Sequence, residues 1–153
     1  MKIAVIYYSR HHENTKKVLE GMAEGHEEEI SLVDVTSHEI PDLADYDAIG
    51  FASGIYSGKF HESVMDCAEK YLSAWQKTFL IYTCGAPSRR YTSAMTDLLH
   101  EKKTDILGEF GCRGFDTFGP FQMIGGINRK HPNAKDLQNA QDFYREIREK
   151  VQQ

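Results

Sequence analysis

The chain has only three cysteines among its 153 residues: Cys67, Cys84 and Cys112. No two of them form a CxxC pair, so the sequence supports neither a zinc site nor a dithiol redox motif. Free thiols are typical of a reducing compartment. We therefore expect a cytoplasmic protein.

Long apolar runs are also missing. Residues 1–8 are too short for a signal-peptide core and lead at once into polar residues. No apolar run approaches the length that a membrane span needs. We expect neither secretion nor a membrane partner.

Positive charge is scarce as well. The formal net charge is −5, which argues against a nucleic-acid partner and weakly favours a basic one. The length suits one domain over 1–153, and hydrophobic and charged contents of 41% and 27% are ordinary for a globular protein.

Short apolar runs alternate with segments of helical periodicity along the chain. The runs predict strands at 3–8, 29–35, 47–53, 78–84 and 109–118. The periodic segments predict one helix from Asn14 to about Gly25, one with an apolar stripe of Val64, Ala68, Tyr71, Leu72 and Trp75, one around 94–99, and one capped by Asn133. This order predicts an α/β fold, a doubly wound three-layer sandwich.

Ligands of such sheets bind outside the carboxyl ends of the strands. That rule selects three loops, at 9–15, 53–61 and 83–91. The first joins a buried strand to a helix start, where backbone N–H groups and the helix dipole attract a phosphate. Ser9, Asn14 and Thr15 add side-chain donors.

Two common nucleotide motifs are absent from these loops. The sequence has no GxxxxGK[ST] P-loop and no GxGxxG dinucleotide fingerprint. A phosphomonoester held by hydroxyls and backbone amides remains. The adjacent His11 and His12 rarely face one metal, so we predict no metal site. Cys84 is interpreted as a small buried residue rather than a catalytic thiolate.

The segment Tyr8-Ser9-Arg10-His11-His12-Glu13-Asn14-Thr15 resembles the phosphate loop of the flavodoxin family, with Ser9 and Asn14-Thr15 as the matching positions. The second and third loops also stand where this family has its flavin loops. The tail from Gly114 to Phe121 and from Gly125 to Asn128 is similar to a short-chain branch of the family. The resemblance covers nearly the whole chain and implies a five-stranded parallel sheet of order 2-1-3-4-5.

The resemblance further implies non-covalent FMN, with its ring between the second and third loops. Tyr56 or Tyr91 would stack on the ring, and Gly58 or Gly54 would let a peptide turn near it. The residues expected to bind the cofactor are Ser9, Arg10, His11, His12, Asn14, Thr15, Ser53, Gly54, Ile55, Tyr56, Ser57, Gly58, Thr83, Cys84, Gly85, Ala86 and Tyr91.

Three functions stay open at this point. The first is an electron carrier whose FMN cycles through its redox states and exchanges electrons with redox partner proteins. The second is a small FMN-dependent NAD(P)H:quinone-type oxidoreductase, in which Arg89 and Arg90 would hold the nucleotide phosphate. The third is a scaffold without flavin. The compact length and the lack of a catalytic acid or base favour the carrier.

Overall fold

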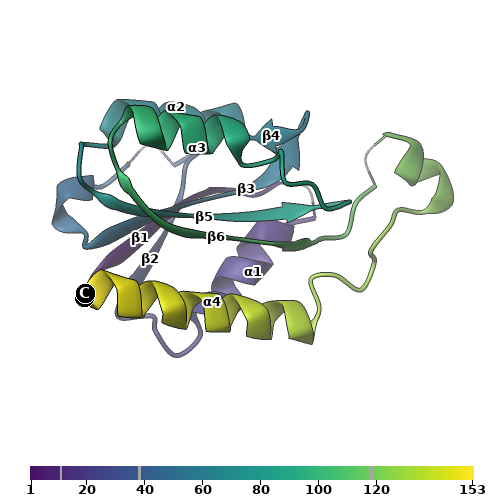
Figure 1. The fold of residues 1–153 in the computed structure, drawn as a ribbon. Coiled ribbons are helices and arrows are strands. Elements are labelled where there is room, and N and C mark those ends of the chain that lie inside the picture. Colours follow the sequence, from purple (N-terminus) through teal and green to yellow (C-terminus); the bar gives the residue numbers. More distant parts are fainter. Residues whose placement is uncertain (11, 38, 118) are drawn as a thin grey trace.

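Five parallel strands form the centre of the molecule (Figure 1). The computed structural model describes residues 1–10, 12–37, 39–117 and 119–153. The parallel strands are β1 (Ile3–Tyr8), β2 (Ile30–Asp34), β3 (Ala48–Tyr56), β5 (Lys77–Cys84) and β6 (Asp105–Arg113). Their spatial order β2-β1-β3-β5-β6 is the predicted order 2-1-3-4-5 of the parallel strands. A sixth strand, β4 (Lys59–Phe60), pairs antiparallel with β3 and was not predicted.

Helices cover both faces of this sheet, which confirms the three-layer sandwich (Figure 1). The helices are α1 (Asn14–Ala23), α2 (Glu62–Tyr71), α3 (Ser93–Glu101) and α4 (Ala134–Gln152). Helices α1 and α4 pack on one face and α2 and α3 on the other. Burial on both faces explains why β1 is an uninterrupted apolar run, with Ile3 and Ile6 fully buried.

The last predicted strand was placed too late in the chain. Strand β6 spans Asp105–Arg113 rather than 109–118. It lies at the edge of the sheet and is only partly buried, so its first half lacks the apolar run that marks the inner strands. The strand ends at Arg113, and the next residue, Gly114, packs closely against the side chain of Asn14.

The predicted stripe of the second helix was wrong at two positions. Val64, Ala68 and Leu72 are buried, but Tyr71 is 41% exposed and Trp75 is 81% exposed. Helix α2 ends at Tyr71, and Trp75 lies beyond it with a φ of 71°. The helical spacing therefore does not apply to Trp75.

The second loop is shorter than expected. Strand β3 continues to Tyr56 instead of stopping at 53, and β4 begins at Lys59. Only Ser57 and Gly58 connect them, both at positive φ (52° and 78°), as a two-residue hairpin requires. A short 3-10 helix, η1 (Leu43–Asp45), lies in the connection between β2 and β3.

The expected cap of the last helix is confirmed. The Asn133 side chain accepts a hydrogen bond from the Asp136 N–H, and the Asp136 carboxylate accepts one from the Asn133 N–H. This reciprocal capping box fixes where α4 begins. The segment from 114 to 133 therefore ends at a defined point after projecting beyond the sheet (Figure 1).

Candidate functional site

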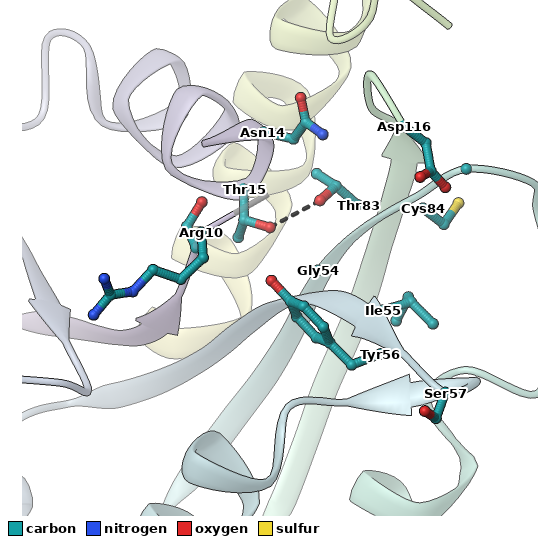
Figure 2. A pocket seen from close by; sticks show the side chains of 12 residues that line it. Arg10, Asn14, Thr15, Gly54, Ile55, Tyr56, Ser57, Thr83, Cys84 and Asp116 are labelled. Carbon is teal, nitrogen blue, oxygen red and sulfur yellow. Dashed lines mark hydrogen bonds between the residues drawn. The ribbon is translucent and has the colours of Figure 1, made fainter. Parts of the chain in front are cut away.

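A cavity of about 240 Å³ opens at the carboxyl ends of β1, β3, β5 and β6. All three loops that the sequence selected contribute to it, and Figure 2 shows their side chains. The lining residues are Ser9, Arg10, Asn14, Thr15, Gly54, Ile55, Tyr56, Ser57, Thr83, Cys84, Gly85 and Asp116. Eleven of these twelve were expected from the sequence.

At the start of α1 the N-cap residue, Glu13, makes no capping hydrogen bond with its own side chain. His12 and Glu13 both have positive φ (55° and 56°), and no hydrogen bond from the Glu13 side chain closes the helix. The Ser9 hydroxyl accepts from the Lys16 N–H at 3.1 Å, one turn into the helix. The remaining N–H groups of the first turn and the positive end of the helix dipole make this end attractive to an anion.

A buried pair of hydroxyls joins the first loop to the third. Thr15 Oγ1 and Thr83 Oγ1 are 2.8 Å apart, and the two residues are 1% and 4% exposed (Figure 2). Two hydroxyls carry two protons, and their mutual hydrogen bond uses one. In the described parts of the chain neither hydroxyl has a further acceptor. The second proton is therefore available to an acceptor in the cavity.

Asn14 has a structural task that its sequence position did not indicate. Its Nδ2 donates to the Phe115 carbonyl at 2.8 Å, and its Oδ1 accepts from the Phe115 N–H at 3.2 Å. A Cβ atom at position 114 would lie 2.5 Å from Asn14 Nδ2, so the chain passes closely here because Gly114 has no side chain. Asn14 thus ties the start of α1 to the segment after β6.

The second loop supplies an aromatic wall. The Tyr56 ring lies over Gly54, within 3.4 Å of where a Cβ atom of residue 54 would stand. The Tyr8 ring meets the Tyr56 ring edge-on, with centroids 5.5 Å apart, and stacks on the His61 ring at 3.7 Å. These contacts hold Tyr56 at the cavity, where it faces Arg10 and Thr15 across the opening (Figure 2).

The third loop carries a thiol that is not a nucleophile at neutral pH. The pKa of Cys84 is raised to about 11, chiefly by burial; the positive charge of Arg113 lowers it, and the Asp116 carboxylate makes a smaller contribution that raises it. Cys84 is 7% exposed. A protonated, buried thiol acts as a small apolar wall, in agreement with its interpretation from the sequence.

Asp116 was missed by the sequence analysis. Its carboxylate lies directly against Gly85, where any side chain would collide with Asp116 Oδ2. The Asn128 side chain donates to the Gly85 carbonyl at 2.6 Å, so the segment after β6 holds the third loop at two points. Ending the last strand at Arg113 instead of 118 would have placed Asp116 just beyond a carboxyl end and revealed it as a candidate.

Several predicted residues lie near the cavity without lining it. The Tyr91 hydroxyl donates to the Ala86 carbonyl at 2.7 Å, and His12 Nε2 lies 2.8 Å from Thr117 Oγ1. Ser53 is fully buried and accepts from the His61 N–H at 3.0 Å. Gly58 is in the hairpin turn. His11 lies outside the described residues.

The described residues also bear on two other kinds of site. They contain no group of three or more His, Cys, Asp or Glu side chains placed to hold a metal ion. None of the helices in these ranges combines the length and apolarity that a membrane crossing demands.

The chain resembles known proteins over its whole length. It is 38% identical over 149 residues to an uncharacterized protein of Methanocaldococcus jannaschii, covering 96% of this chain and 98% of that one. A flavodoxin from the domain Archaea matches with a TM-score of 0.75, 17% identity and full coverage of both chains. A flavoprotein in complex with FMN from Lactobacillus acidophilus matches with a TM-score of 0.55 and 18% identity, and the match covers 72% of this chain and 92% of that one.

A family profile decides the assignment. The family model described as "Flavodoxin domain" matches residues 5–114. This range includes the three loops that the sequence selected and every lining residue except Asp116. The structural matches agree with it in fold. The chain therefore belongs to the flavodoxin domain family.

Proposed function

We propose that this chain binds FMN non-covalently in the cavity and serves as an electron carrier. The observation that carries this proposal is the cavity itself. It combines a helix start, a hydroxyl pair with a spare proton, an aromatic wall and a carboxylate around one opening. These features match the different parts of one flavin mononucleotide.

The phosphate fits the side of the cavity next to α1. The N–H groups of the helix start and the Ser9 hydroxyl would surround it, and the Thr15–Thr83 pair would donate one proton to it or to the adjoining chain. The acidic residue of the first loop, Glu13, is exposed and does not line the cavity, and Asp116 lines it from the segment after β6. The residues present therefore suit a phosphomonoester.

The flat ring fits the opposite side. Ile55, Tyr56 and Cys84 offer apolar and aromatic surface. The Asp116 carboxylate can accept a hydrogen bond from an imide N–H, a group that the flavin ring carries. FMN is present in the related Lactobacillus acidophilus flavoprotein, which supports the choice of this flavin. When bound, FMN would supply the redox chemistry, and the chain would hold and orient it.

A carrier fits the site better than a reductase. Among the described residues that line the cavity there is no histidine or lysine to serve as a catalytic acid or base. The Cys84 thiol, the nearest nucleophile, is protonated at neutral pH. Electrons would therefore pass between the exposed ring edge and partner proteins. The three free cysteines agree with work in the cytoplasm.

The test compares two sources of electrons for the FMN-loaded protein. We expect reduction by dithionite or by a partner reductase, and no appreciable steady-state oxidation of NADPH or NADH by the protein alone. Saturable NAD(P)H turnover with a quinone, weakened by R89A or R90A, would establish the reductase instead. Failure to bind flavin would contradict both and leave the scaffold.

A further inference from the structure

The segments that lead out of the strands around the cavity carry exposed positive side chains. We define the rim as the described residues of the segments 9–13, 54–61, 85–92 and 113–133, which lead out of the four strands around the cavity; residues 11 and 118 are not included. Seven exposed cations lie on it: Arg10, Lys59, Arg89, Arg90, Arg113, Arg129 and Lys130. The only acidic residues in these segments are Glu13 and Asp116.

The rim differs in sign from the rest of the chain. The whole sequence has 18 Lys and Arg against 23 Asp and Glu. Removing the rim leaves eleven cations and 21 acids, so the net charge is +5 on the rim and −10 elsewhere. A bound phosphomonoester would offset about two of the positive charges, and the rim would remain positive. The expectation of a basic partner was based on the net charge of the whole chain, which combines these two regions of opposite sign.

The rim cations do not form ion pairs with other described residues of the chain. In the parts of the chain that the structure describes, none of the seven forms a salt bridge. The Arg10 guanidinium lies 5.9 Å from the centre of the Tyr8 ring and points away from the Thr15–Thr83 pair (Figure 2). Arg129 Nε donates to the Gly125 carbonyl and keeps its side chain exposed. These charges face solvent and any molecule that approaches the cavity.

Apolar side chains accompany the cations. Met123 is 90% exposed and Ile124 is 72% exposed, in the 3-10 helix η2 (Gly119–Ile124) that projects beyond the sheet in Figure 1. Exposed apolar groups next to charged ones are typical of a protein-binding surface, with an apolar centre and a polar rim. A nucleic acid would instead be held through its phosphate backbone, mainly by cations and polar donors. Exposed Met and Ile side chains add little to such binding, so they favour a protein partner.

We infer that the rim is the docking surface for an acidic electron-transfer protein. This inference rests on the proposed function, because it assumes that the occupant of the cavity exchanges electrons. Positive charge around the opening would attract an acidic partner, speed the encounter and orient it so that its redox centre faces the cavity. Met123 and Ile124 would then give the complex apolar contact.

The first test reads the sign of the local charge with two small oxidants. The FMN-loaded, reduced protein is mixed with hexacyanoferrate(III), an anion, or hexaammineruthenium(III), a cation, at increasing NaCl. We expect salt to slow the reaction with the anion and to speed the reaction with the cation, because salt screens the rim. The opposite pattern, which the overall charge of −5 would give, would overturn the inference.

The second test uses an acidic iron–sulfur ferredoxin as the electron-transfer partner. The rim variants are R89E/R90E and R129E/K130E, and the matched control is K2E/K70E, which makes the same change in net charge at exposed positions away from the rim. At low ionic strength each rim variant should slow the second-order transfer at least about tenfold, and the control less than about twofold. Circular dichroism and FMN absorbance confirm that each variant is folded and loaded.

Each of the other possible outcomes contradicts either docking at the rim or the proposed function. Equal slowing in rim and control variants would contradict docking at the rim, while FMN binding would remain intact. A raised KM for NADPH in R89E/R90E, with turnover, would assign these cations to a nucleotide instead. Tight binding of a labelled RNA oligomer that the rim variants abolish would assign them to nucleic acid. A protein that takes up no FMN would contradict the proposed function itself.

Discussion

Strand β5 carries a buried threonine near each end, and the two differ in what their hydroxyls bind. At the amino end, Thr78 Oγ1 lies 3.2 Å from Thr104 Oγ1 and donates to the Asp105 carbonyl, while Thr104 donates to the Leu99 carbonyl. At the carboxyl end, the Thr83 hydroxyl has Thr15 as its one partner among the described residues, beside the cavity. The first pair uses both of its protons inside the protein, and the second keeps one for a ligand.

The same contrast holds for charges. Before β2, at the amino end, the Glu29 carboxylate accepts two hydrogen bonds from Arg148, at 2.8 and 2.9 Å, and one from the Tyr144 hydroxyl at 3.0 Å. At the carboxyl end the rim cations make no such pairs among the described residues. Groups that satisfy one another stabilise the fold, and groups that face a cavity or solvent are available for binding.

The largest expected effect comes from separating the start of α1 from the segment after β6. In G114A the new Cβ atom would meet Asn14, and both hydrogen bonds between Asn14 and Phe115 would be lost. Two hydrogen bonds and a steric clash amount to about 3 kcal/mol, or roughly a hundredfold weaker FMN binding. Fluorescence titration measures this affinity. The control is G25A, at a turn with no neighbouring atoms around the glycine, and a loss of FMN affinity there would argue against a local cause.

The next effect compares the two threonine pairs directly. T15V removes the hydroxyl that shares the spare proton, and we expect FMN to bind roughly tenfold to a hundredfold more weakly, as for a hydrogen bond to a charged group. T78V should lower the free energy of unfolding by about 1 kcal/mol and leave FMN affinity unchanged. Equal effects of both variants on FMN affinity would remove the distinction between the ends of β5.

A smaller effect concerns stability and pH at the amino end. Hydrogen bonds from Arg148, and then from Tyr144, lower the pKa of Glu29. This stabilisation is present above the unfolded-state pKa of about 4.3 and is lost as the pH falls through the lower folded-state pKa. E29Q should therefore cost about 1 kcal/mol at pH 7, since the pair is partly exposed, and progressively less in acid. Urea unfolding across pH measures it, and E28Q, at the exposed neighbouring residue, should show no such trend.

The sequence predicted the parts of this molecule that local patterns determine. Buried strands are apolar runs, and the rule that ligands bind at carboxyl ends selected three of the four segments that line the cavity. The contact between Asn14 and Phe115 was not predictable, because it joins residues 101 positions apart and depends on where β6 ends. The edge strand β6 gave a weak signal, so Asp116 was assigned to a strand. The positive rim was hidden because net charge averages over the chain.

The central claim is that the open groups at the carboxyl end bind the phosphate of FMN. Titration of the purified protein with FMN and with riboflavin, followed by flavin fluorescence, tests it most directly. Riboflavin has the same ring without the phosphate, so the account predicts quenching by the protein for FMN and binding at least about a hundredfold weaker for riboflavin. Equal affinity for the two flavins would contradict the account.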